Sequence, residues 1–103
     1  MSLDKTLLKE ISILYVEDDD VMRTELASLL TNFFAQVFCA SNGTQGLEIF
    51  KKNHKKIDLI ISDINMPKMS GIDMIKEIRN FDKEVGVIFS TAYSDKELSL
   101  IHI

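Results

Sequence analysis

Three nearly uninterrupted apolar runs are the feature that most constrains what this chain can fold into. They lie at residues 11–16, 57–61 and 85–89 and are rich in isoleucine and valine. A strand with one wet face alternates apolar and polar residues, whereas a parallel strand covered on both faces is apolar almost throughout. A weaker candidate, Gln36 to Ala40, is expected nearer an edge. The runs therefore predict the buried central strands of a parallel sheet.

Between these strands the spacing of apolar residues becomes helical. The clearest stripe has intervals of three and four residues along one helical face: Met22, Leu26, Leu29, Leu30 and Phe33. Shorter stripes at 47–50 and 74–78 mark two more helices. A capping-box spacing at 94–97, ahead of Leu98 and Ile101, predicts that a fourth helix starts there. Strands alternating with helices predict an α/β doubly wound sheet with helices on both faces, whose functional crevice lies beyond the carboxyl ends of the strands.

Composition excludes several classes of protein. The 103 residues carry 12 basic and 16 acidic side chains, a net charge of −4, so we expect no direct binding to nucleic acid or to a membrane surface. The longest apolar runs, such as 37–40, fall far short of the roughly 20 residues that cross a bilayer. The single cysteine, Cys39, forms no internal disulfide, and this favours a cytoplasmic protein. We expect Cys39 itself to be a small buried residue. Residues 1–10 are expected to be an N-terminal leader, ahead of one domain over 11–103.

Acidic residues follow the predicted strands. Glu17 and Asp18 come directly after the first strand, with Asp19 and Asp20 behind them, and Asp63 ends the third. Because parallel strands end at the same edge of a sheet, these carboxylates should converge, which like-charge repulsion opposes unless a cation neutralises them. An all-oxygen set suits a hard ion such as Mg²⁺. Asp19 and Asp20 also suit the N-terminus of a helix.

The strand ends carry motifs that match a known family. They are Tyr15-Val16-Glu17-Asp18-Asp19, then Asp63-Ile64-Asn65-Met66-Pro67 with Gly71, and Val87-Ile88-Phe89-Ser90-Thr91-Ala92. Taken together and in this order, from about Ile11 to the last residue, they resemble the receiver domain of two-component response regulators. The resemblance implies a flavodoxin-like α/β fold, with a doubly wound parallel sheet of order 2-1-3-4 and helices on both faces.

The same resemblance implies a function and its residues. Asp63 would accept a phosphoryl group from a sensor histidine kinase, a phosphotransfer protein or a small phosphodonor. Mg²⁺ would be bound by Asp18, by Asp63 and by the backbone carbonyl of Asn65, with Glu17 acting through water. Such a domain is a signalling switch rather than an enzyme, and it at most assists its own phosphotransfer and dephosphorylation. Its downstream partner would be an effector domain or protein.

Residues after the fourth strand would sense the phosphoryl group. The resemblance implies that the Thr91 hydroxyl and the Ala92 backbone contact a phosphoryl oxygen. The family pattern continues with a fifth strand that carries a lysine and with a fifth helix, and no residue of this chain fills that lysine position. We therefore expect a C-terminally incomplete domain without the fifth strand. The strand at 85–89 would then be an uncovered edge through which the chain self-associates.

Three alternative functions stay open at this point. A receiver-like module without phosphorylation would only bind proteins, which the missing lysine favours and the intact acids disfavour. A haloacid-dehalogenase-like phosphatase needs a second aspartate two residues after its nucleophile, where this chain has Asn65. A flavin binder needs a hydroxyl- and glycine-rich phosphate loop after the first strand, where the acids at 17–20 would repel phosphate.

Overall fold

The computed structural model describes the backbone of residues 5–80, 82–92 and 98–102, and the side chains of 7–80 and 82–90. Within these residues, five strands form one sheet in the order β2-β1-β3-β4-β5. They are β1 (Ser12–Val16), β2 (Gln36–Ala40), β3 (Leu59–Asp63), β4 (Gly86–Ala92) and β5 (Leu98–His102). The first four run parallel, which confirms the predicted order 2-1-3-4, and β5 runs antiparallel to β4.

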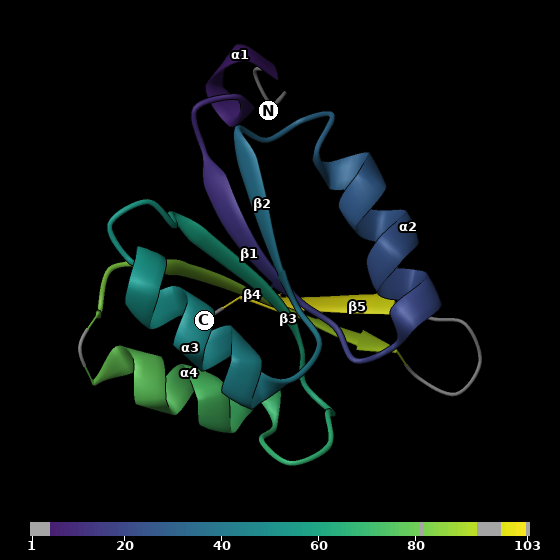
Figure 1. Cartoon of the computed structure of the whole chain (residues 1–103), viewed down its shortest axis with the longest axis vertical. Helices are drawn as coiled ribbons and strands as arrows, with labels where there is room; N and C mark the ends of the chain where they lie inside the picture. The colour runs from purple at the N-terminus through teal and green to yellow at the C-terminus, as the bar shows by residue number, and fades with distance from the viewer. Residues whose placement is uncertain (1–4, 81, 93–97, 103) are drawn as a thin grey trace.

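The described helices are α1 (Lys5–Leu8), α2 (Asp20–Leu30), α3 (Gly43–Asn53) and α4 (Gly71–Arg79). The three longer ones begin after a residue whose side-chain oxygen accepts a backbone N–H three residues later: Asp19, Asn42 and Ser70. The helices α3 and α4 lie side by side on one face of the sheet, and α2 lies on the other face (Figure 1). Within the described ranges, no helix combines the length and the apolar character needed to cross a membrane.

The hydrophobic core lies between the sheet and the α3–α4 layer. Its fully or almost fully buried members come from the sheet and from these two helices: Leu14, Val16, Phe50, Ile60, Met74, Ile78, Val87 and Phe89. Gly46 lets α3 approach the sheet, because a Cβ there would lie 3.0 Å from Val16 Cγ2 and 2.8 Å from the Met74 sulfur. Burying one such side chain contributes about 1.5–3 kcal/mol, so this layer holds the strands in place.

The apolar stripe of α2 is less buried than predicted. Met22 is 42% exposed and Leu29 is 52% exposed, and no residue of α2 is fully buried. Phe33 lies beyond the end of the helix. The reason is that α2 contacts β1 and β2 without a second described helix beside it, whereas α3 and α4 cover each other's flanks (Figure 1).

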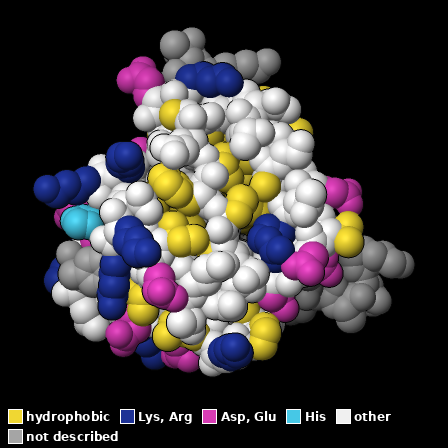
Figure 2. All heavy atoms as spheres, viewed as in Figure 1, with side chains coloured by type: hydrophobic (Ala, Val, Ile, Leu, Met, Phe, Trp, Pro, Cys, Tyr) yellow, Lys and Arg dark blue, Asp and Glu magenta, His cyan; other side chains and the backbone are white. Residues whose placement is uncertain are grey.

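Cys39 is exposed, so the expectation that it is buried was wrong. The residue belongs to β2, which forms one edge of the sheet and therefore has a strand on one side only. Figure 2 shows apolar side chains at the surface between α2 and α3, over the place where β2 runs in Figure 1. The position of β2 within the sheet, rather than its composition, therefore determines that Cys39 is exposed.

The C-terminal segment corrects two further expectations. Residues 98–102 form β5 instead of a helix, and β5 pairs with β4 along the edge that was expected to be uncovered, with Phe89 opposite Ile101. A helix cap contributes about 1 kcal/mol, whereas pairing satisfies a whole row of backbone groups that would otherwise lack partners. Residues 93–97, which carry the predicted cap, lie outside the described part of the chain.

The N-terminal segment, expected to be a leader, contains the short helix α1. Its end is closed by backbone hydrogen bonds from Glu10 N to Leu7 O and from Ile11 N to Leu8 O, both 3.0 Å. The chain then enters β1 at Ser12.

Two isoleucines of α4 provide a test of the packing. Ile78 is fully buried in the core, whereas Ile72 is 42% exposed on the same helix. We predict that Ile78→Ala lowers the free energy of unfolding by about 2–5 kcal/mol, because it leaves a cavity. The matched change Ile72→Ala should cost less than about 1 kcal/mol. Urea unfolding followed by circular dichroism measures both, and equal losses would contradict the described position of α4.

Candidate functional site

Three carboxylates meet at the carboxyl edge of the sheet. β1 pairs with β3 so that Val16 is opposite Ser62, which brings Glu17 and Asp18, just beyond β1, level with Asp63 at the end of β3. Carboxylate oxygens of Glu17, Asp18 and Asp63 lie within 4.8 Å of one another. Glu17 is buried, Asp63 is partly exposed and Asp18 is exposed. The predicted convergence of these three side chains is therefore present in the fold.

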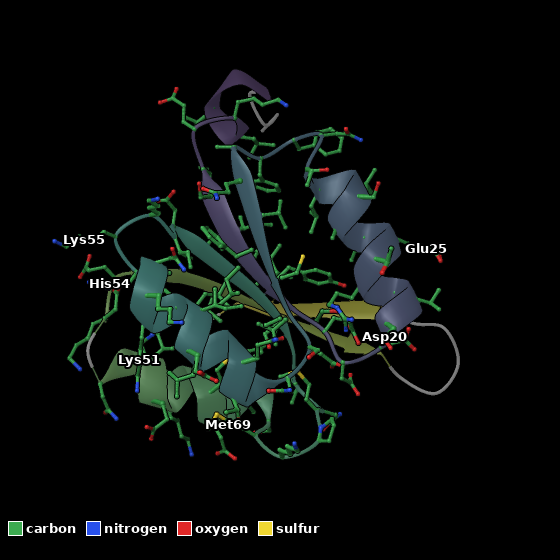
Figure 3. The ribbon with its side chains drawn as sticks, in the orientation of Figure 1. Asp20, Glu25, Lys51, His54, Lys55 and Met69 are labelled. Atoms are coloured by element: carbon green, nitrogen blue, oxygen red, sulfur yellow. The ribbon has the colours of Figure 1, made fainter. Side chains whose placement is uncertain are left out.

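The next two acids serve the start of α2. Asp19 Oδ1 accepts the backbone N–H of Met22 at 2.9 Å, and exposed Asp20 pairs with Arg23 Nη2 at 2.6 Å. The other arm of the guanidinium donates to the backbone oxygen of Glu17 at 2.8 Å. Figure 3 shows Asp20 at the N-terminal end of α2. Asp19 therefore caps α2 and Asp20 pairs with Arg23 in its first turn, which agrees with the helix N-terminus that their positions in the sequence suggested.

The segment after β3 is held rigidly around Asp63. Gly71 N donates to Ile64 O at 2.9 Å, and a Cβ on Gly71 would collide with the Asp63 carbonyl oxygen. Only glycine therefore fits here. Lys68 has a positive φ of 70°, in a tight turn closed by Met69 N donating to Pro67 O at 2.9 Å. The glycine contact and the turn fix where the chain returns from Asp63 into α4.

Hydrogen bonds also orient the backbone and side chain of Asp63. The Asn65 N–H donates to Asp63 Oδ1 at 3.3 Å, and the Ser62 hydroxyl donates to the Asp63 carbonyl at 2.9 Å. Asp63 Oδ1 is thus directed by the loop that follows it. Asn65 itself is exposed beside this carboxylate.

The site carries an excess of negative charge. Burial, reinforced by the charges of Asp63 and Asp18, raises the pKa of Glu17 to about 7, although the Asp19 N–H donates to Glu17 Oε2 at 3.1 Å. Burial and the Asp18 charge also raise the pKa of Asp63, against the backbone N–H groups of Asn65 and Ile64. In the described part of the chain, no lysine or arginine pairs with any of these three carboxylates. Figure 3 shows Lys51, His54 and Lys55 far from Asp20, at the opposite end of the molecule.

This donor set fits a hard divalent cation. All three side chains offer oxygen, and Mg²⁺ is held in proteins by a few carboxylates together with water. A cation would also offset the repulsion that raises the pKa values of Glu17 and Asp63. The geometry and the electrostatics therefore point to the same kind of ligand.

Comparison with known proteins places this chain in a family. The chain matches the response regulator receiver domain over residues 13–101. It belongs to this receiver-domain family. Receiver domains are signalling domains of two-component and phosphorelay proteins, and they bind Mg²⁺ through acidic residues. The sequence resemblance is thereby confirmed.

Relatives and solved structures agree with this assignment. The chain is 38% identical, over 89% of its length, to the transcriptional regulatory protein ZraR of Klebsiella oxytoca. It spans 20% of that protein, and 19% and 39% of two further curated regulators.

Two solved complexes contain similar chains. The chain resembles one in the CheX–CheY–BeF3–Mg complex of Borrelia burgdorferi, with 30% identity, a TM-score of 0.74 and coverage of 82% of this chain and 64% of that one. It also resembles one in the Saccharomyces cerevisiae complex of the histidine phosphotransfer protein Ypd1 with the receiver domain of Ssk1. That match has 28% identity, a TM-score of 0.74 and coverage of 85% and 68%.

Two predicted residues of the receiver site are placed only by their backbone. Asp63 is opposite Ser90 in the β3–β4 ladder, so β4 carries Thr91 and Ala92 past the same edge. Their side chains lie outside the described part.

Sequence reasoning also missed one polar group. The Tyr15 hydroxyl is buried and unpartnered among the described residues, on the same face of the β1 segment as Glu17. Its only sequence signal is the spacing of two residues along a strand.

The raised pKa of Glu17 predicts a pH-dependent stability for the metal-free receiver domain. The folded chain holds this proton up to about pH 7, whereas the unfolded chain releases it near the usual pKa of 4.5. The folded state then binds more protons, so the free energy of unfolding should fall as pH rises from about 4.5 to about 7, by at most about 3 kcal/mol. Urea unfolding in the presence of a chelator measures this slope.

Matched variants identify the group responsible for this slope. Glu17→Gln should remove most of it, because the amide does not titrate. Glu48→Gln changes an exposed glutamate of α3 and should leave it as in the wild type. A wild-type stability that is flat or rises over this range would contradict the described environment of Glu17.

Proposed function

We propose that this receiver domain accepts a phosphoryl group on Asp63 in a Mg²⁺-dependent reaction. The observation that carries the proposal is the position of Asp63, at the carboxyl end of β3 with oxygens of Glu17 and Asp18 within 4.8 Å. A carboxylate there is exposed enough for a phosphodonor to reach it, and the two further acids beside it can hold a cation. The complex of a similar chain with BeF3 and Mg supports the same assignment.

The chemistry requires an in-line displacement at phosphorus. An Asp63 carboxylate oxygen attacks the phosphorus and forms a new O–P bond, while the P–N bond of a phosphohistidine breaks and the imidazole leaves with the electron pair. Both reactants are negatively charged, so neutralisation at the attacking oxygen lowers the barrier. Asp18, Asp63 and the backbone carbonyl of Asn65 would hold Mg²⁺, with Glu17 acting through water. A bound ion would supply positive charge that offsets the negative charge of the two reactants.

The readout of this modification lies at the end of β4. We assign the Thr91 hydroxyl and the Ala92 backbone as the groups that contact a phosphoryl oxygen, because β4 passes Asp63 at Ser90 and continues into these two residues. A hydroxyl donates to an oxygen that exists only in the phosphorylated state. The contact would therefore couple the modification to the surface around β4, where a downstream effector domain or protein would respond.

The proposed donor is a sensor histidine kinase or a histidine phosphotransfer protein in the cytoplasm. The structure of a similar chain, the Ssk1 receiver with Ypd1, supports this class of partner. The net charge of −4 disfavours nucleic acid and membranes as direct partners. The domain would act as a phosphoacceptor and not as an enzyme, since the phosphoryl group ends on its own side chain.

Phosphorylation of Asp63 is directly testable. We predict that acetyl phosphate with Mg²⁺ adds one phosphoryl group to the chain, detected by intact-mass spectrometry, and that Asp63→Asn abolishes the addition. Asp73→Asn changes an exposed aspartate of α4 and should leave it intact. Equal modification of the Asp63→Asn variant would move the acceptor elsewhere. A wild-type chain that is never modified, with Mg²⁺ bound, would favour the protein-interaction alternative.

The two acids after β1 should differ in their effect on the metal. We predict that Asp18→Ala weakens Mg²⁺ binding more than Glu17→Ala does, because Asp18 would bind the ion directly and Glu17 through water. Isothermal titration calorimetry ranks the two variants against the wild type. The reverse order would exchange the roles of Glu17 and Asp18.

A further inference from the structure

Tyr15 presents a buried polar group that the proposed mechanism does not use. The residue is only 2% exposed, and its hydroxyl has no hydrogen-bond partner among the residues that the structure describes. Most buried hydroxyls in folded proteins are paired, so an unpaired one requires an explanation, such as a role in a functional site. Tyr15 also belongs to the strand that leads into the acidic site.

The geometry of the sheet places the Tyr15 side chain on the same face as two of the acids. Alternation along a strand puts Tyr15 and Glu17 on one face, and Glu17 stays in the ladder because its N–H donates to Ala40 O at 3.1 Å. Across the ladder Tyr15 is opposite Ile61, and Asp63 follows two residues later on the same face. Burial, with the charges of Glu17 and Asp63 nearby, raises the pKa of Tyr15, so the phenol remains a neutral donor.

Glu17 has a matching requirement for a donor. Its carboxylate accepts one described hydrogen bond, from the Asp19 N–H to Oε2 at 3.1 Å. The neighbouring guanidinium of Arg23 is directed elsewhere, with one arm on the Glu17 backbone oxygen and the other on Asp20. A buried carboxylate that is ionised needs further hydrogen bonds. Tyr15 therefore offers a donor that has no acceptor among the described residues, and Glu17 is a carboxylate with a single described hydrogen-bond donor.

We propose that Tyr15 is a positioning residue of the cation site, whose hydroxyl donates a hydrogen bond to the Glu17 carboxylate once a divalent cation is bound. The inference rests on the proposed Mg²⁺ function and adds a residue to it. The hydrogen bond holds the Glu17 side chain in place and compensates its buried charge, as outer groups around metal ligands do in other proteins. In this role Tyr15 would contact neither the phosphoryl group nor the ion.

The first experiment removes the hydroxyl alone. In the whole chain, Tyr15→Phe keeps the ring and should weaken Mg²⁺ binding by about 10-fold in calorimetry, in the range found for such outer groups. The matched change Tyr93→Phe removes the other tyrosine of the chain and should leave the affinity within about 2-fold of the wild type. A Tyr15→Phe variant with wild-type affinity would overturn the inference, whatever its stability.

A double-mutant cycle tests whether the effect passes through Glu17. If the hydroxyl acts on this carboxylate, Tyr15→Phe should change Mg²⁺ affinity by less than about 2-fold when Glu17→Gln is already present. If the two losses instead multiply, the hydroxyl acts on another group and the proposed hydrogen bond is wrong. Because both side chains keep their size, the cycle separates this interaction from packing.

A spectroscopic readout follows the hydroxyl without changing it. The chain has two tyrosines and no tryptophan, so in the Tyr93→Phe variant the tyrosine absorbance belongs to Tyr15 alone. Addition of Mg²⁺ should shift this band and saturate with the affinity measured by calorimetry. If the absorbance band stays unchanged while Mg²⁺ binds, the inference about Tyr15 is overturned and the proposed function is not. A wild-type chain that binds no Mg²⁺ overturns the proposed function and the inference with it.

Discussion

β1 and β3 pair in parallel with Val16 opposite Ser62, and the geometry of the site depends on this register. Side chains along a strand alternate between faces, so a slip of one residue would turn Asp63 toward α3 and separate it from Glu17. The register is maintained because Leu14, Val16 and Ile60 are buried against the α3–α4 layer. The hydrophobic contacts on one face therefore position the carboxylates that meet at the edge.

The carboxylate cluster opposes the stability of the fold that holds it. Burial and neighbouring charge raise the pKa values of Glu17 and Asp63, so at neutral pH the metal-free chain has either a retained proton or unrelieved repulsion. Functional sites commonly reduce stability in this way, and a bound ligand restores it. A divalent cation would relieve the cost, which is why affinity for the ion and stability of the domain should be linked.

The two faces of the sheet differ in packing. α3 and α4 bury a continuous core, while α2 leaves part of its apolar stripe exposed and contributes Arg23 and the Asp19 cap to the site. The packed α3–α4 face holds β3 in place, and the close contact of Gly71 with the Asp63 backbone adds a second constraint on Asp63. The acids after β1 and the start of α2 are held by hydrogen bonds and one exposed ion pair, which are weaker constraints.

The sequence by itself determined the four parallel strands and the meeting of the acids. A strand buried on both faces must be apolar throughout, as 57–61 nearly is, and parallel strands must end at one edge, which brings Asp63 to Glu17 and Asp18. The tertiary structure alone decided the rest. Whether Cys39 is buried, and whether 98–102 form a helix or β5, depends on which segments lie beside them. That the hydroxyl of Tyr15 has no partner among the described residues likewise depends on which side chains pack around it, and local patterns carry no information about that packing.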